Sequence, residues 1–265
     1  MDWLEALILG LLQGLTEFLP VSSSGHLELG KAILGVDATE GLAFTVVVHG
    51  ATVLSTIVVF RKDLLKLFKG LFCFKWNEET RYIAKILVSM IPVGIIGVFF
   101  KDFIKSFFSG DNVALVGSML IVTALLLFFT SVSKHKERKV SFLDSIIIGI
   151  AQAIAVLPGI SRSGSTIATG LLLGNKRELI AKFSFLMVIL PILGENFLDI
   201  FSGEFTNEQG IGITALVIGF VVAFISGLLA CKWMIKIVKK GKLIYFAIYC
   251  FIIGTIAIIY GLTGV

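Results

Sequence analysis

Charged residues are scarce in this sequence. Only 15% of its 265 residues are Asp, Glu, Lys or Arg, whereas soluble domains usually carry about 25%. Hydrophobic residues make up 57% of the chain and its mean hydropathy is +0.99, so most side chains cannot face water. Long apolar segments separated by short polar loops predict an integral membrane protein built as a helical bundle, because a β-barrel would alternate over segments of about ten residues.

Cysteines and long charged stretches are also few. The three cysteines, Cys73, Cys231 and Cys250, lack metal-binding spacing, and their odd number argues against a disulfide framework. The formal net charge of +5 comes from a few loops, so there is no basic soluble domain and we expect no nucleic-acid partner. No Lys or Arg precedes Lys31, so the first segment lacks the basic region of a secretory signal and is expected in the mature fold.

Six segments are long enough, at about 19–21 residues, to cross a bilayer. They are roughly Leu42–Phe60, Tyr82–Phe100, Val113–Ser131, Phe183–Phe201, Ile211–Cys231 and Leu243–Gly261. Residues 2–34 and 142–173 are apolar too, but "FLPVSSSG" and "VLPGISRSG" interrupt them. A helix that stops at Pro20 or Pro158 and restarts afterwards forms a re-entrant hairpin.

Loop charges indicate the orientation. The basic loops comprise residues 61–81, 134–139, 175–182 and 232–242, whereas 202–210 is acidic and 101–111 is nearly balanced. If both broken regions return to the side from which they enter, every basic loop falls on one face. The positive-inside rule makes that face cytoplasmic, and both termini then lie on the outer side.

The two broken regions resemble each other. "GLLQGL" parallels "GIAQAI", and "SSSG" parallels "SRSG" further on. Each half is then a re-entrant hairpin followed by three transmembrane helices, with repeats over about 1–133 and about 141–265 of a single membrane domain (1–265). An odd number of spans inverts the second copy, so we expect an all-α inverted-topology repeat whose broken helices meet near the midplane. Chance similarity between Gly- and Ser-rich apolar segments is the alternative.

Charged and amide side chains accompany the two breaks. Gln13 and Glu17 lie one turn apart on the polar face of the first helix, and Arg162 lies in the second break. A carboxylate in a bilayer costs about 2.5–3.5 kcal/mol on insertion scales. Glu17 therefore needs a cationic partner, for which Arg162 is the best candidate. The two residues either form a structural ion pair or serve a ligand.

Serines surround these charges. Ser22–Ser24 and Ser161–Ser163 begin the second arm of each hairpin, so two helix N-termini would point N–H groups at one spot. Gly25, Gly159 and Gly164 permit close backbone approach. Helix capping is the alternative role for any one serine, but so many serines beside an arginine and a histidine favour an oxyanion ligand.

Two histidines lie in these apolar segments. His26 follows the first serine run and could act as a general acid, a nucleophile or a proton shuttle, or could be a hydrogen-bonded structural residue. For His49, in "VVVHGATV", functional and structural roles are equally open. Residues at the end of a predicted span could line the mouth of the site, with no role assigned: Glu195, Asn196 and Asp199.

The stretches "QGLTEFLPVSSSGH" and "LPGISRSGST" resemble the two signature motifs of the undecaprenyl-diphosphate phosphatases of the bacitracin-resistance type. The resemblance covers essentially the whole chain. It implies hydrolysis of undecaprenyl diphosphate, the bacterial lipid carrier of peptidoglycan synthesis, to the monophosphate and inorganic phosphate. It also implies a place in the cytoplasmic (inner) membrane and a site that opens to the periplasmic face.

The resemblance also implies roles for residues. The catalytic residues would be Glu17, Ser23, His26 and Arg162. A divalent cation, Mg²⁺ or Ca²⁺, is expected beside Glu17, with Gln13 at the family's other ligand position, where a carboxamide binds metal more weakly than a carboxylate. We expect substrate contacts from Gln13, Ser22, Ser24, His49, Ser161, Ser163 and Thr166. Whether serine, histidine or water attacks the phosphorus stays open.

A transporter or flippase of a phosphate-bearing lipid is the competing function, because inverted repeats with broken midplane helices are also the plan of carriers. A structural scaffold would leave buried Glu17 and Arg162 unexplained. The expected partners are the polyprenyl diphosphate substrate and membrane lipid. The residues leave open whether the protein works as a monomer or as a homodimer.

Overall fold

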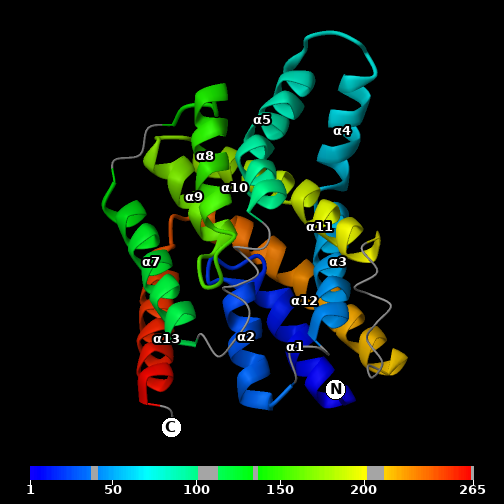
Figure 1. Ribbon diagram of the computed structural model, residues 1–265. Coiled ribbons are helices and arrows are strands. Elements are labelled where there is room, and N and C mark those ends of the chain that lie inside the picture. Colours follow the sequence, from blue (N-terminus) through cyan, green and yellow to red (C-terminus); the bar gives the residue numbers. More distant parts are fainter. Residues whose placement is uncertain (37–40, 101–112, 134–136, 202–211, 264–265) are drawn as a thin grey trace.

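The computed structural model describes residues 1–36, 41–100, 113–133, 137–201 and 212–263. Apart from an isolated bridge between Arg138 and Asn175, the regular structure in these ranges is helical, which confirms the all-α prediction (Figure 1). The helices are α1 (Trp3–Thr16), α2 (Ser23–Leu34), α3 (Gly41–Val59), α4 (Arg61–Leu71), α5 (Glu78–Phe99), α7 (Val113–Val132), α8 (Phe142–Ile154), α9 (Arg162–Leu172), α10 (Arg177–Met187), α11 (Ile189–Phe201), α12 (Ile213–Lys239) and α13 (Ile244–Thr263).

Both predicted breaks are present. α1 and α2 form one hairpin and α8 and α9 form the other, and Pro20 and Pro158 lie in the connecting turns. Proline has no N–H to donate and its ring clashes with the preceding helical turn, so neither helix continues through it. Each second arm begins at a serine cap: Ser22 accepts from the third residue on at 3.3 Å, and Ser161 does so at 3.0 Å.

The two hairpins enter from opposite ends of the molecule and meet at their tips (Figure 1). Ser163 Oγ donates to the carbonyl oxygen of Leu19 at 3.2 Å, which joins α9 to the first turn. Gly25 and Gly159 permit the approach, because a Cβ added at Gly25 would lie only 3.1 Å from the Cα of Gly159. The predicted meeting of the two broken regions is confirmed.

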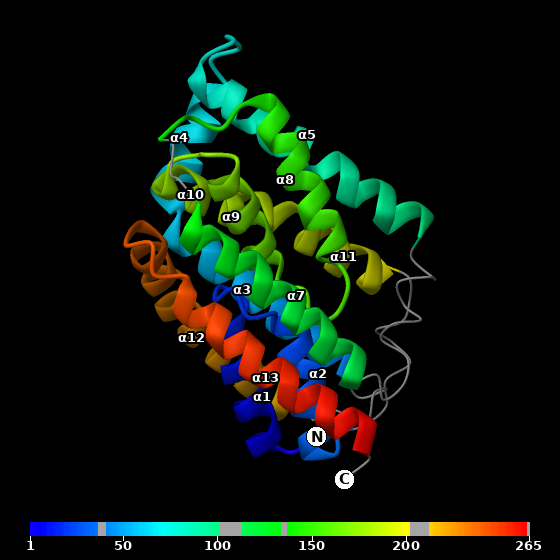
Figure 2. The same cartoon turned by 90° about the vertical axis from the view of Figure 1, so that its left-hand side faces the viewer.

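Six of the helices pack in three pairs. α1 packs along α12, α8 packs along α5, and α7 lies beside α13 (Figure 2). Gly10 of α1 faces the carbonyl oxygen of Gly219, and the matching Gly149 of α8 faces that of Ser89, so a Cβ on either glycine would clash. The inverted repeat itself stays a prediction from the sequence.

Four of the described helices are long and apolar enough to cross a membrane, namely α5, α7, α12 and α13, and α3 with α4 makes a fifth if the bent pair counts as one span. The predicted continuous span Phe183–Phe201 is wrong, because the helix breaks at Val188 between α10 and α11. Pro191 accounts for the break, since it has no N–H for the carbonyl group of Met187 four residues earlier.

The basic segments that the structure describes gather at one end of the molecule, as the loop charges predict. Lys182 pairs with Asp63, and Lys239 pairs with Glu178 at 2.6 Å, so segments far apart in sequence meet there. The start of α1 lies at the opposite end (Figure 1). The two loops expected at that opposite end fall outside the described residues: 101–111 and 202–210.

Candidate functional site

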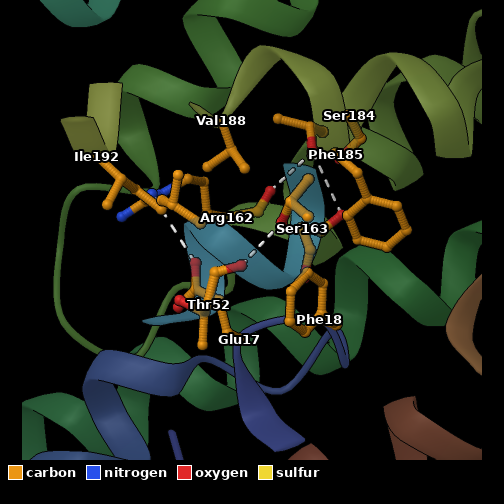
Figure 3. A pocket seen from close by; sticks show the side chains of 12 residues that line it. Glu17, Phe18, Thr52, Arg162, Ser163, Ser184, Phe185, Val188 and Ile192 are labelled. Carbon is orange, nitrogen blue, oxygen red and sulfur yellow. Dashed lines mark hydrogen bonds and ion pairs between the residues drawn. The ribbon is translucent and has the colours of Figure 1, made fainter. Parts of the chain in front are cut away.

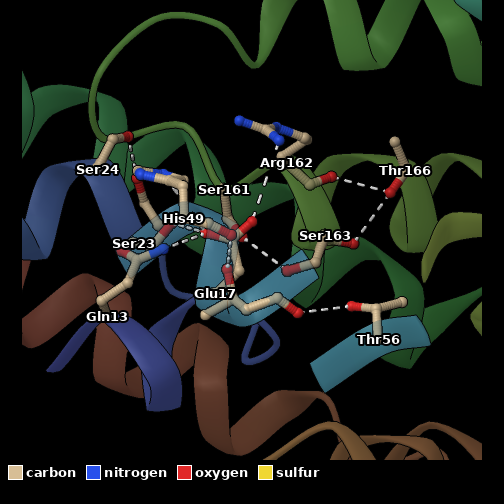
Figure 4. A network of polar contacts seen from close by, with 12 residues as sticks. Gln13, Glu17, Ser23, Ser24, His49, Thr56, Ser161, Arg162, Ser163 and Thr166 are labelled. Atoms are coloured by element: carbon tan, nitrogen blue, oxygen red, sulfur yellow. Dashed lines mark hydrogen bonds and ion pairs between the residues drawn. The ribbon is translucent and has the colours of Figure 1, made fainter. Parts of the chain in front are cut away.

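Glu17 follows the last residue of α1 and lies where the two hairpins meet (Figure 4). Its side chain is only 7% exposed. Ser23 Oγ donates to its Oε2 at 2.6 Å, and Gln13 Nε2 donates to the same oxygen at 2.9 Å. Arg162 Nη1 lies 4.0 Å from Oε1, and His49 Nε2 lies 3.9 Å from Oε2. The structure thus gathers four residues of the sequence prediction around this carboxylate.

Local structure explains each of these positions. Gln13 precedes Glu17 by four residues, so the two side chains share a helix face. Ser23 is the first residue of α2 and Arg162 the first residue of α9. Both helix N-termini therefore face Glu17, and their partial positive charges favour an anion beside them. His49 comes from the middle of α3.

Two polar atoms of the site have no hydrogen-bond partner within the part of the chain that the structure describes. They are Nη1 of Arg162 and Oε1 of Gln13, and both are buried. The 4.0 Å contact from Nη1 to Glu17 is an ion-pair distance that is too long for a hydrogen bond. Because a buried unpaired polar group costs free energy, the site offers a ligand one donor and one acceptor.

Two hollows flank Glu17 and Arg162, and both residues line each of them. The larger, of about 350 Å³ when the open space in front of it is counted, has apolar and hydroxyl-bearing walls (Figure 3): Phe18, Thr52, Val53, Thr56, Ser163, Thr166, Ser184, Phe185, Val188 and Ile192. The smaller, of about 260 Å³ counted in the same way, is lined mainly by hydroxyl-bearing side chains: Thr16, Ser22, Ser23, Ser24, Ser161 and Ser163, with Ala155 and Ile160. A polar hollow beside a more apolar one suits a ligand with an anionic head and an apolar chain.

Three hydroxyl-bearing residues of the larger hollow were missed by the sequence analysis: Thr52, Thr56 and Ser184. For α3 a signal existed, because His49, Thr52 and Thr56 recur at spacings of three and four and so share one face of an apolar helix. Thr166, which was predicted, exchanges a 2.6 Å hydrogen bond with Ser184 and donates to the carbonyl oxygen of Arg162 at 2.8 Å. It therefore holds the first turn of α9 against α10.

His26 does not contact Glu17. Its Nδ1 lies 2.9 Å from the carbonyl oxygen of Ser22, and its Nε2 lies 2.9 Å from the hydroxyl of Tyr249 in α13. A carbonyl oxygen only accepts, so Nδ1 carries a proton, and when the ring is neutral its Nε2 accepts from the hydroxyl of Tyr249. Ser22 has a φ of 70°, which is unfavourable for a residue with a Cβ. The His26 ring thus helps to hold a strained residue in place.

A complete metal site is not formed by protein side chains alone in the ranges that the structure describes, since no group of three His, Cys, Asp or Glu side chains converges there. Glu17 and the unpaired Oε1 of Gln13 offer oxygen ligands of the kind that Mg²⁺ and Ca²⁺ prefer. Mg²⁺ is often held by one or two protein oxygens together with substrate phosphates. The residues present fit a cation that is shared with a phosphate ligand.

The residues expected at the mouth of the site are described only in part. Asn196 Nδ2 donates to the carbonyl oxygen of Val46 at 3.3 Å, which joins α11 to α3. The side chains of Glu195 and Asp199 lie outside the described residues.

Comparison with known proteins finds one family along nearly the whole chain. The family model described as bacitracin resistance protein BacA matches residues 6–256. An undecaprenyl-diphosphatase of Bacteroides fragilis is 58% identical over 98% of this chain and 98% of its own length. Those of Bacteroides thetaiotaomicron (59%, covering 98% and 99%) and Methanococcus vannielii (40%, covering 97% and 100%) are similar along the same extent.

Proposed function

The chain belongs to the bacitracin resistance protein BacA family, and from that membership and the buried site between its hairpins we infer that it is an undecaprenyl-diphosphatase. It hydrolyses undecaprenyl diphosphate to undecaprenyl phosphate and inorganic phosphate. This reaction recycles the lipid carrier of peptidoglycan synthesis and gives bacitracin resistance. The protein is a multi-pass membrane protein.

One observation carries the assignment of the site. The two hairpin tips bring a buried carboxylate, Glu17, and a buried guanidinium nitrogen of Arg162 to the N-termini of α2 and α9. A diphosphate needs positive charge and N–H donors, and its lipid chain needs an apolar outlet. The two adjoining hollows offer both kinds of surface.

We take Ser23 as the attacking group, because its Oγ lies 2.6 Å from Glu17 Oε2. Glu17 accepts the proton of Ser23 while Oγ forms a bond to the terminal phosphorus. The bond from that phosphorus to the bridging oxygen breaks, and the oxygen leaves with its electron pair on undecaprenyl phosphate. Water then attacks the phosphoserine, inorganic phosphate leaves, and Oγ regains its proton from Glu17. In this step Arg162 stabilises the charge that develops on the phosphoryl oxygens.

Purified protein in detergent micelles tests the function. It should release inorganic phosphate from undecaprenyl diphosphate and leave the monophosphate, with no membrane gradient present. A transporter or flippase, the alternative that the similar proteins do not favour, needs sealed vesicles and would leave the diphosphate intact. Absence of phosphate release from folded protein supplied with Mg²⁺ or Ca²⁺ would contradict the assignment.

A divalent cation held by Glu17 and Gln13 is part of the proposal. When bound, it would supply positive charge to the phosphate oxygens. The Gln13→Glu variant offers a second carboxylate, which binds hard cations more strongly than an amide oxygen does. We expect this variant to need a lower Mg²⁺ concentration for half-maximal phosphate release after chelator treatment. The Gln13→Met variant, which has a side chain of similar size without the oxygen, should need a higher Mg²⁺ concentration. If the wild type and both variants need the same Mg²⁺ concentration, cation binding at Gln13 is contradicted.

Tyr249 is expected to assist the reaction indirectly, by orienting the His26 ring that holds Ser22 at the start of α2. The Tyr249→Phe variant keeps the ring that stacks on His26 at a centroid distance of 5.6 Å but removes the hydroxyl. We expect kcat to fall by about threefold to tenfold, the worth of one hydrogen bond, with KM little changed. In a His26→Gln background the same change should have no further effect, because the contact is already lost.

Tyr245 provides the matched control for Tyr249. It lies one turn earlier on α13 and is 63% exposed. Tyr245→Phe should leave kcat unchanged. If the two phenylalanine variants behave alike, Tyr249 does not act through His26.

We further propose that the protein lies in the bacterial cytoplasmic membrane with the site open to the periplasmic side and both termini outside. The gathering of the described basic segments at one end supports this orientation, since Lys and Arg concentrate in cytoplasmic loops.

A further inference from the structure

Helix α4 and the turn after it, residues 61–76, expose large apolar side chains at the basic end of the molecule. The exposed fractions are 59% for Leu65, 56% for Phe68, 71% for Phe72, 91% for Phe74 and 60% for Trp76. Leu65, Phe68 and Phe72 are spaced by three and four residues, so they form one face of the helix. None of the residues of α4 is buried. This apolar face therefore lacks a covering element among the described residues.

Lysines border the apolar face. Lys62, Lys66 and Lys69 are exposed along α4, and Lys75 is exposed in the turn beside Trp76. Lys66 pairs with a glutamate of α5 at 3.3 Å. A helix with an apolar face next to a lysine-rich face is typical of segments that lie within the headgroup region of a membrane.

The geometry of the chain supports the same location. α4 follows α3 with only Phe60 between them, and the chain bends there by 75°. A helix that leaves a membrane-embedded helix at this angle runs along the membrane surface. Asp63 holds α4 in place through its pair with Lys182 of α10, and on the helix it lies opposite the apolar face of Leu65, Phe68 and Phe72. In Figure 1, α4 and the start of α5 lie at the end of the molecule opposite the N-terminus.

We propose that residues 61–76 form a surface that binds the headgroup region of an anionic membrane. The aromatic side chains enter the boundary between headgroups and acyl chains, and the lysines contact lipid phosphates. The lysines select this occupant over a second copy of the chain, whose corresponding surface would present the same positive charge. They also give the surface a preference for anionic over zwitterionic lipid.

Tryptophan fluorescence tests this surface on the full chain in lipid nanodiscs. Trp3→Phe/Trp233→Phe retains only Trp76, and Trp76→Phe/Trp233→Phe retains only Trp3 as the control. The two probes are matched, since each is 60% exposed, but Trp3 lies at the opposite end beside Asp2 and Glu5. The discs contain phosphatidylcholine with or without phosphatidylglycerol, brominated near the headgroup end of the acyl chains. We expect bromine to quench Trp76, and to quench it more when phosphatidylglycerol is present, whereas Trp3 shows no such increase.

Charge variants and disc occupancy make the test sharper. Lys62→Gln/Lys69→Gln should abolish the increase with phosphatidylglycerol while leaving quenching in phosphatidylcholine. Trp76 that is unquenched in both membranes would overturn the proposal, and so would quenching that is the same with and without the anionic lipid. Protection of Trp76 that appears only with two chains in a disc would assign the surface to a second copy instead. Size-exclusion profiles and melting temperatures confirm that each variant is folded.

Discussion

Arg162→Ala is expected to lower kcat for phosphate release by about a thousandfold, the effect of removing a group that stabilises transition-state charge. The guanidinium is placed at the tip contact with its Nη1 buried and without a hydrogen bond among the described residues. A lysine at this position keeps the charge but loses the planar fork of donors. Arg162→Lys should therefore retain part of the activity. Initial rates of phosphate release from micellar undecaprenyl diphosphate measure both effects.

Folding and catalysis must be separated in this test, because loss of Arg162 leaves the carboxylate of Glu17 buried without its cation. The double variant Glu17→Gln/Arg162→Ala removes the uncompensated charge and should melt close to the wild-type temperature, yet remain inactive. Arg81→Ala, at an exposed arginine on α5, is the control and should be fully active. Activity of a folded Arg162→Ala within about tenfold of wild type would contradict charge stabilisation by this residue.

The tip contact could be predicted because the two broken regions resemble each other and because local chemistry determines the breaks and the charge pair. Pro20 and Pro158 interrupt two apolar helices however those helices pack. A carboxylate buried in the membrane needs a cationic partner in any fold. The Gln13 and Glu17 pair follows from helix periodicity alone. These three facts depend on no knowledge of packing, and the structure confirms the meeting of the hairpins and the pairing of Glu17 with Arg162.

Other features depend on packing between distant segments. Tyr249 meets His26 across 223 positions of sequence, and no local pattern indicates that α13 passes this point of α2. The break at Val188 was hidden because the apolar run continues through it, although Pro191 was visible in the sequence. Ser184 lines the larger hollow through its contact with Thr166 of α9, and no local pattern indicates that α10 meets α9 there. Hydropathy predicts which segments are shielded from water, but it does not predict where those segments bend.

Glu17 and Ser23 are expected to act as one unit. Glu17→Gln keeps the size of the side chain and an oxygen that can accept from Ser23, but it removes the base. We expect kcat to fall by about a hundredfold to ten-thousandfold, the usual worth of a general base. The kcat of the Ser23→Ala variant should fall to a similar level. The kcat of the double variant should be no lower than that of the slower single variant, because each change disables the same step.

The control for Ser23 is its neighbour Ser24, which lines the same hollow. Its Oγ lies 3.4 Å from Ser22 Oγ, and among the described residues the hydrogen bonds to the Glu17 carboxylate come from Ser23 and Gln13 instead. Ser24→Ala should keep kcat within about tenfold of wild type, since at most one neutral hydrogen bond is lost. Acid quenching during turnover should trap phosphate on the peptide that contains Ser23, because the bond from phosphorus to Oγ outlasts the departure of undecaprenyl phosphate. A Ser23→Ala variant as active as Ser24→Ala, with no phosphopeptide in the wild type, would show that water attacks the phosphorus directly. Glu17 would then be the base for that water, and the loss in Glu17→Gln would remain.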